Sequence, residues 1–80
     1  MSMVTAYILI ISDSGAEKNI IDDLLEVDGV QEADVIYGEY DILAKISIPD
    51  VSMLGDFILE NIRPIQGVKR TSTLISAEHE

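Results

Sequence analysis

Polar side chains that are suited to holding a small molecule occur in one short segment, Gly-Glu-Tyr-Asp at residues 38–41, between two apolar β-type runs. A glycine at such a position supplies the positive φ that a tight hairpin turn requires. The turn alone does not explain why a tyrosine and a carboxylate stand side by side at the mouth of a strand that is expected to be buried. The segment therefore supplies the first candidate binding residues, which are Gly38, Glu39, Tyr40 and Asp41.

A second group of polar residues lies near the end of the chain. The only pair of adjacent basic residues, Lys69-Arg70, precedes two alternating threonines, Thr71 and Thr73. One interpretation is an edge strand whose charges and hydroxyls discourage pairing with other chains. The other is a set of hydrogen-bond donors that faces a small polar ligand. Both interpretations stay open, and Arg70, Thr71 and Thr73 join the candidate binding residues.

Residues for catalysis or metal binding are sparse. The only histidine, His79, stands next to the C-terminus, where disorder is the usual state of a chain. The serines have no base in a recognisable context, and there is no cysteine. Asp22, Asp23 and Glu26 belong to the solvent side of a predicted helix, whereas calcium and magnesium need ligands that converge from a loop. We therefore expect no enzyme, no cofactor and no metal site.

The charge and the length narrow the class of protein further. Fifteen acidic and five basic residues give the 80-residue chain a net charge of −10, which repels nucleic acids. No apolar run approaches the roughly 20 residues that cross a bilayer, and the first residues lack the features of a signal peptide. We therefore expect a cytoplasmic protein that forms one domain over residues 1–80, with its core at about 3–77.

Hydrophobic periodicity predicts the order strand, helix, strand, strand, helix, strand. Strands are expected at residues 3–11, 30–37, 40–48 and 68–76. The first helix is expected to begin at a capping box, with Ser14 as the N-cap and Glu17 three residues later, and to end at Gly29. The second is expected between Pro49-Asp50 and Pro64. The apolar stripes of the two helices are Ile20, Ile21, Leu24, Leu25 and Val27, and Met53, Leu54, Phe57, Ile58 and Ile62.

An internal echo supports this order. The segment VDGVQEADVI at residues 27–36 aligns with IQGVKRTSTL at 65–74, with an offset of 67 − 29 = 38 between the glycines. Each half then reads strand, helix, Gly-Val, strand. Two such halves predict an α+β fold of the ferredoxin-like βαββαβ type, with a four-stranded antiparallel sheet and both helices on one face. The first and third strands are expected at its centre.

One face of such a sheet has no helix to cover it. The first strand offers either Val4, Ala6, Ile8 and Ile10 or Tyr7, Leu9 and Ile11 to that side, and neither set is a typical wetted surface. Apolar faces of this kind usually mark an interface. We therefore expect a homodimer in which two sheets pack against each other.

The hairpin and the last strand together resemble a known family. The segments VIYGEYDILAKI and LGDFILENIRPIQGVKRTSTLI are similar to the effector domain of the Lrp/AsnC family of feast/famine regulators, a module called RAM. The resemblance covers residues 3 to about 77. It implies a dimeric α+β barrel-like assembly, rings of such dimers, and amino-acid effectors bound at the interfaces between dimers. The matching residues are Gly38, Tyr40, Asp41, Gly67, Val68, Thr71 and Thr73.

The resemblance also suggests roles for the candidate residues. Asp41 or Glu39 would pair with the α-ammonium of an amino acid, and backbone amides near Gly38 or the side chain of Arg70 would receive its carboxylate. The hydroxyls of Tyr40, Thr71 and Thr73 would orient the ligand or line its side-chain end. The structural alternative is that Asp41 bonds back to turn amides and that Tyr40 packs across the dimer interface.

Full-length members of this family carry an N-terminal helix-turn-helix domain, for which no room is expected before Met3. The resemblance therefore implies a stand-alone RAM protein, a non-catalytic amino-acid-binding and oligomerisation module without DNA binding of its own. It would form mixed oligomers with full-length regulators. The alternative function is a purely structural or interaction protein that modulates such regulators through mixed oligomers and binds no effector.

Overall fold

The elements alternate as the periodicity predicts. A computed structural model describes residues 3–77, so His79 lies outside the described part. No helix in that part is long and apolar enough to span a bilayer. The elements are β1 (Val4–Ser12), α1 (Glu17–Leu24), β2 (Val30–Val35), β3 (Ile42–Ile48), the short 3-10 helix η1 (Val51–Met53), α2 (Leu54–Asn61) and β4 (Val68–Ile75).

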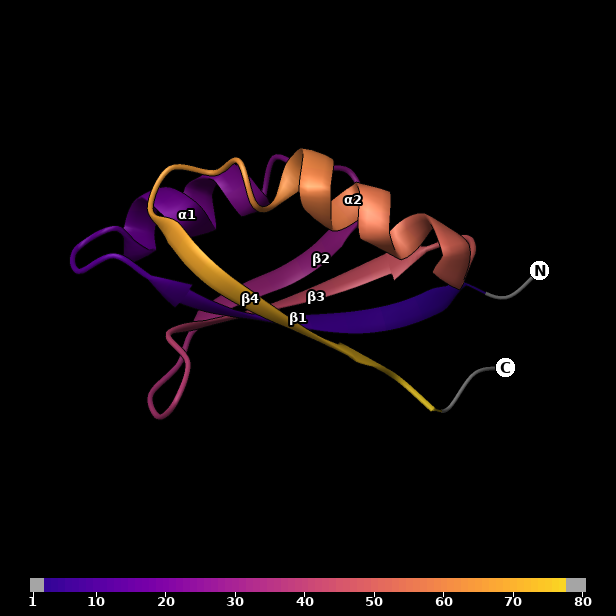
Figure 1. Cartoon of the computed structure of the whole chain (residues 1–80), viewed down its shortest axis with the longest axis horizontal. Coiled ribbons are helices and arrows are strands. Elements are labelled where there is room, and N and C mark those ends of the chain that lie inside the picture. The colour runs from indigo at the N-terminus through magenta and orange to yellow at the C-terminus, as the bar shows by residue number, and fades with distance from the viewer. Residues whose placement is uncertain (1–2, 78–80) are drawn as a thin grey trace.

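The four strands form one antiparallel sheet in the order β2-β3-β1-β4. Both helices lie on the same side of this sheet (Figure 1), and the other side carries no helix of the described chain. In the register, Ile8 of β1 stands opposite Ala44 of β3 and Thr73 of β4. The ferredoxin-like fold and the central position of the first and third strands are confirmed.

The core lies between the sheet and the helices. Side chains of successive strand residues point to opposite faces, so one alternating set from β1 and one from β3 face the helices. These sets are buried together with four residues of the helical layer. The buried residues are Ala6, Ile8, Ile10, Ile42, Ala44, Ile46 and Ile48 from the sheet, and Ile20, Leu24, Leu54 and Ile62 from the helical layer.

The opposite set of side chains forms what we call the open face. Tyr7, Leu9, Ile11 and Leu43 are half-buried there, and Leu74 of the edge strand is 53% exposed. The structure thus decides between the two faces of β1, because the Val-Ala-Ile-Ile face packs on the helices and the Tyr-Leu-Ile face does not. Burying the open face would remove further apolar area from water, and each Å² so buried contributes about 25 cal/mol of stabilising free energy.

The first helix differs from its prediction at both ends. Ser14 is not the N-cap, because Ser14 and Gly15 form a turn in which Ala16 N donates to Asp13 O at 3.1 Å. Ala16 takes the N-cap position and makes no side-chain capping bond. The helix ends at Leu24 and not at Gly29, since residues 25–29 form turns. Leu25 is 55% exposed and does not belong to the core stripe.

The hairpin and the second helix also differ from their predictions. β2 ends at Val35 and β3 begins at Ile42, so residues 36–41 form a wider loop than the two-residue turn at Gly38-Glu39. Ile36 N donates to Asp41 O at 2.8 Å and closes this loop. At the start of the second helix, Met53 is 48% exposed, so core packing does not account for it.

The internal repeat is visible in the backbone. Gly29 and Gly67 both have a φ of +100°, which favours glycine. Each carbonyl bonds to the other half of the chain: Gly29 O accepts from Ser47 N, and Gly67 O accepts from Asp13 N, both at 2.8 Å. The two Gly-Val turns therefore join the end of each helix to the end of the opposite central strand.

Candidate functional site

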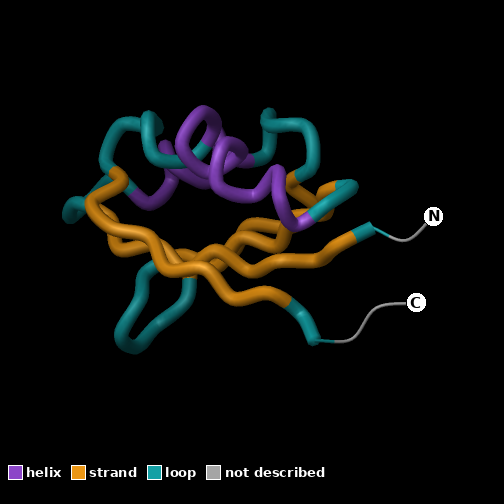
Figure 2. Tube along the Cα trace, turned by 45° about the vertical axis from the view of Figure 1, so that its right-hand side comes forward, coloured by secondary structure: helices purple, strands orange, loops and turns teal. Residues whose placement is uncertain are grey.

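The loop of residues 36–41 projects from the sheet on the side away from the helices (Figure 2). Gly38 has a φ of +128°, and a Cβ added there would meet no heavy atom within 4 Å beyond its chain neighbours. Glu39 is exposed, and the neighbouring Tyr37 is 99% exposed. The tip of the loop is therefore available to contact another molecule. Tyr37, which the sequence analysis did not select, belongs to this surface.

Asp41 anchors the base of the loop on β1. Its backbone N–H donates to Ile10 O, and its carboxylate oxygen Oδ2 accepts from the backbone N–H of Ser12, both at 2.9 Å. The side chain thus bonds to a neighbouring strand rather than to turn amides. The hydroxyl of Ser12 is buried without a hydrogen-bond partner among the described residues. Asp41 is half-buried, and Oδ2 is the oxygen committed to Ser12.

Arg70 lies level with Asp41 on the other side of β1. Ile11 of β1 stands opposite Arg70 of β4, and Asp41 directly precedes Ile42, which stands opposite Ile10. Neighbouring strands are about 4.8 Å apart, so roughly 10 Å separates the two backbones. A carboxylate and a guanidinium therefore flank the end of β1. A zwitterion that bonds to the carboxylate is within reach of the long arginine side chain.

The two threonines face away from Arg70. Thr71 stands opposite Ile10 and Thr73 opposite Ile8, and both isoleucines face the helices. Cross-strand partners share a face, so the threonine side chains lie on the helix side and Arg70 on the open face. Tyr40 is half-buried at the base of the loop. A single chain brings the loop and Arg70 to one region but does not bring Thr71 and Thr73 there.

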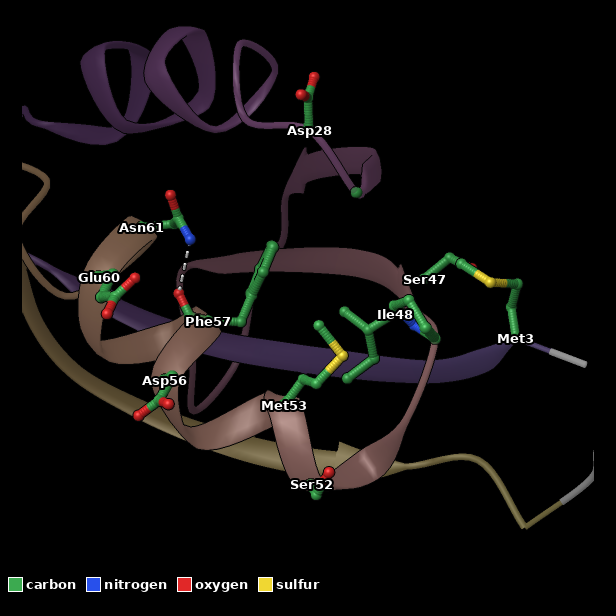
Figure 3. A pocket seen from close by; sticks show the side chains of 12 residues that line it. Met3, Asp28, Ser47, Ile48, Ser52, Met53, Asp56, Phe57, Glu60 and Asn61 are labelled. Atoms are coloured by element: carbon green, nitrogen blue, oxygen red, sulfur yellow. Dashed lines mark hydrogen bonds between the residues drawn. The ribbon is translucent and has the colours of Figure 1, made fainter.

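A cavity that the sequence analysis missed lies at the other end of β3. It has a volume of about 570 Å³ and opens between α2, the end of β3 and the α1–β2 turn (Figure 3). Met3, Ile48, Met53 and Phe57 supply its apolar lining. Three acidic residues, Asp28, Asp56 and Glu60, also border it. The only signal in the sequence was the Met53/Phe57 spacing, which fits core packing equally well.

Charge pairing is rare in the described part of the chain. Its only ion pair joins Lys18 Nζ to Asp22 Oδ2 at 2.9 Å, on the exposed face of α1. The hydrogen bond and the charge of Asp22 raise the pKa of Lys18. Both residues lie on the solvent side of the helix, as the sequence analysis predicted for Asp22. Within residues 3–77, the carboxylates at the loop and at the cavity form no ion pair.

Residues 5–79 match the family model of the Lrp/AsnC ligand binding domain. The chain belongs to this family. Within it, the chain is 35% identical over 75 residues to an uncharacterised HTH-type transcriptional regulator of Pyrococcus furiosus, covering 90% of this chain and 50% of that protein. The chain thus spans about half the length of the curated regulators it matches. The sequence resemblance to Lrp/AsnC effector domains is confirmed.

Solved structures share the fold, and one of them is AsnC. A hypothetical protein from Pyrococcus horikoshii is 39% identical with a TM-score of 0.86, and the match covers 95% of this chain and 92% of that one. AsnC of E. coli is 28% identical with a TM-score of 0.87, and the match covers 94% of this chain and 51% of that one.

One match lies outside the regulators. A stretch of 47 residues is 45% identical to part of the homocitrate synthase of Sulfolobus acidocaldarius, covering 59% of this chain and 10% of the enzyme. Sequence related to this Lrp/AsnC domain therefore also occurs within the chain of a metabolic enzyme.

Proposed function

We propose that this Lrp/AsnC domain is a non-catalytic module that binds an amino-acid effector and couples its binding to oligomerisation. The observation that carries the proposal is the arrangement at the end of β1, where the anchored carboxylate of Asp41 and the guanidinium of Arg70 flank one strand. An α-amino acid needs one partner of each charge. A charged partner gives stronger hydrogen bonds than a neutral one.

In this proposal the oxygen of Asp41 that is not bonded to Ser12 accepts from the α-ammonium, with Glu39 as a second acceptor. Arg70 or the backbone amides near Gly38 donate to the α-carboxylate. Tyr40 orients the ligand from the base of the loop. Because Thr71 and Thr73 lie on the other face of the sheet, they reach a ligand only from a neighbouring copy of the chain.

The proposed assembly starts from the open face. Tyr7, Leu9, Ile11 and Leu43 form an apolar surface that a second copy would cover in a sheet-to-sheet homodimer, and rings of dimers would bring the loops to the outer interfaces. A ligand shifts such an assembly only if it binds one assembly state more tightly than the other. We place the module in the cytoplasm with its regulator relatives, where mixed oligomers with full-length Lrp/AsnC proteins would form.

The net charge supports a role without direct DNA contact. The chain carries −10 in total, and DNA binding rests on lysines and arginines that displace counterions from phosphates. With this charge, the module is better suited to act by binding partner proteins than by binding DNA itself. The similarity to a segment of homocitrate synthase supports the same view, because related sequence is found outside helix-turn-helix proteins as well.

A second candidate function is a structural module that joins mixed oligomers and binds no effector. The bond from Ser12 N to Asp41 Oδ2 favours it, since that bond gives the carboxylate a role in holding the loop without any ligand. Both functions need the same dimer. They differ only in whether a free amino acid binds.

Calorimetry with each of the twenty amino acids, combined with light scattering, separates the two functions. We expect one or more amino acids to bind and to change the molar mass of the assembly. Arg70→Gln should weaken binding roughly tenfold, because it removes a charge-assisted bond. Lys69→Gln, which makes the same change of charge at the adjacent exposed residue, should bind as the parent does. Absence of any binding at millimolar concentration would favour the structural module.

A further inference from the structure

We propose that the cavity at the end of β3 is a second ligand site and that it binds a small organic amine, a molecule with one ammonium group on an apolar body. The cavity is formed at Ile48, whereas the loop of residues 36–41 precedes Ile42 at the other end of the strand. The site is therefore separate from the proposed effector site, and the inference does not depend on it.

The lining supplies the apolar half of this recognition. Ile48 is 3% exposed and closes the inner wall, while Phe57 is half-buried and Met53 is 48% exposed. A volume of about 570 Å³ falls within the usual range for small-molecule sites, about 300–1,000 Å³. An apolar ligand body placed against Phe57 and Met53 would displace water from both, which favours binding.

The charge of the cavity selects a cation. Asp56 and Glu60 come from α2 and Asp28 comes from the α1–β2 turn, and no lysine, arginine or histidine within residues 3–77 lines the cavity. Figure 3 shows the ring of Phe57 between Asp28 on one side and Asp56 and Glu60 on the other, with the carboxylates of Asp28 and Asp56 directed away from the ring at the rim of the cavity. An aromatic face attracts an ammonium group, and carboxylates nearby add to that attraction. An anion would be repelled from the same place.

The walls of the cavity are held by the backbone. Ser47 N donates to Gly29 O at 2.8 Å, and a Cβ added to Gly29 would lie 3.3 Å from Phe57 Cε1. Asn61 Nδ2 donates to Phe57 O at 3.2 Å within α2. These contacts hold Phe57 against the α1–β2 turn before any ligand arrives. A preformed site loses less conformational entropy on binding.

The test compares three probes of similar shape and different charge: 2-phenylethylamine, 2-phenylethanol and 3-phenylpropionate. Binding is followed by NMR through the backbone amides of Gly29, Ser47 and Phe57. We expect the amine to shift these amides in a saturable manner, the alcohol to bind at least about fivefold more weakly, and the carboxylate not to bind, because only the ammonium pairs with the rim. Added salt should weaken the amine alone.

Matched variants test the rim directly. Asp56→Asn combined with Glu60→Gln should weaken binding of the amine by about fivefold, the loss expected for two exposed ion pairs. Asp23→Asn combined with Glu26→Gln makes the same change of charge at two exposed residues, one in the last turn of α1 and one just after it, and should leave binding unchanged.

Three results would overturn the site. If the amine and the alcohol bound equally well, the ammonium group would contribute nothing to binding. If both double variants lost the same affinity for the amine, the net charge of the protein, and not the rim of the cavity, would explain the loss. Amide shifts at the cavity that vary with protein concentration in the absence of a probe would assign this surface to a contact between copies. None of these results bears on the loop, whose test is amino-acid binding with the Arg70→Gln variant.

Discussion

The carboxylate of Asp41 accepts a hydrogen bond at 2.9 Å from the backbone amide of Ser12, a residue 29 positions earlier in the chain. The bond fastens the base of the β2–β3 loop to the last residue of β1. It also leaves the loop tip, with Gly38 and Glu39, free on the side of the sheet that has no helix. One side chain thus sets the position from which the loop can meet a ligand or a neighbouring subunit.

Replacing Asp41 by alanine is expected to lower the free energy of unfolding by about 1–2 kcal/mol, because the backbone amide of the buried Ser12 loses its charged acceptor. The loss is not larger because Asp41 itself is only half-buried. Urea denaturation at one fixed protein concentration measures the change. Asp41→Asn keeps an oxygen acceptor at the same place and should lose about half as much. An Asp41→Ala protein as stable as the parent would show that the bond does not hold the loop.

The two glycines Gly67 and Gly15 provide a paired test of close packing. Both have positive φ, +100° and +85°, but a Cβ at Gly67 would lie 2.5 Å from Ala16 Cβ, whereas one at Gly15 would meet nothing within 4 Å. Gly15→Ala should cost about 1–2 kcal/mol from backbone strain alone. Gly67→Ala should cost about 1–3 kcal/mol more from the clash, as thermal unfolding would report. Equal losses would contradict the contact with Ala16.

Substitutions at adjacent residues of β1 distinguish the proposed dimer interface from the core. Ile8 is fully buried under the helices and Leu9 lies on the open face. Leu9→Asp is expected to give a folded monomer, because the charge disrupts only the sheet-to-sheet contact, whereas Ile8→Asp should unfold the chain. Light scattering gives the mass and circular dichroism the fold. A Leu9→Asp protein that stays dimeric would rule out the proposed interface.

Substitutions at Lys45 test whether the open face tolerates a negative charge. It stands between Tyr7 on β1 and Glu32 on β2, opposite both in the register. Lys45→Glu should weaken the proposed dimer by about tenfold or more, because it places a carboxylate directly opposite Glu32 and leaves it unpaired in the proposed interface. Lys45→Met keeps the apolar stem and should dimerise at least as well. Analytical ultracentrifugation over a dilution series measures both constants.

Local patterns in the sequence were enough to predict the fold. The alternation along β1 separates Ala6, Ile8 and Ile10 from Tyr7 and Leu9 without reference to any other element, since a period of two is a property of the strand itself. The echo of Gly29 and Gly67 predicts two equal halves, and both glycines have the same φ. Both features are visible in the order of residues along the chain, before it is known which elements meet, and the structure confirms them.

Local patterns failed where a distant residue decides the outcome. The Ser14–Glu17 capping box is present in the sequence, yet α1 takes Ala16 as its N-cap without a side-chain capping bond. The contact of Ala16 with Gly67, together with the bond from Asp13 N to Gly67 O, holds the chain at a different point. Packing of the two halves outweighs a bond that is worth about 1 kcal/mol.

The candidate binding residues also show which features the sequence predicts and which depend on tertiary structure. The sequence identified Asp41 and Arg70 as polar residues at the ends of strands, but only the sheet register places them on either side of β1 and turns Thr71 and Thr73 to the other face. The amine cavity needs Gly29, Ile48 and Phe57 from three separate elements, and no spacing along the chain predicts their meeting.

Sequence alone determined which segments are strands and helices and which of their faces are apolar, because those properties are local. The tertiary structure decided which face is covered and which side chains meet, because these depend on pairings between residues far apart in the chain.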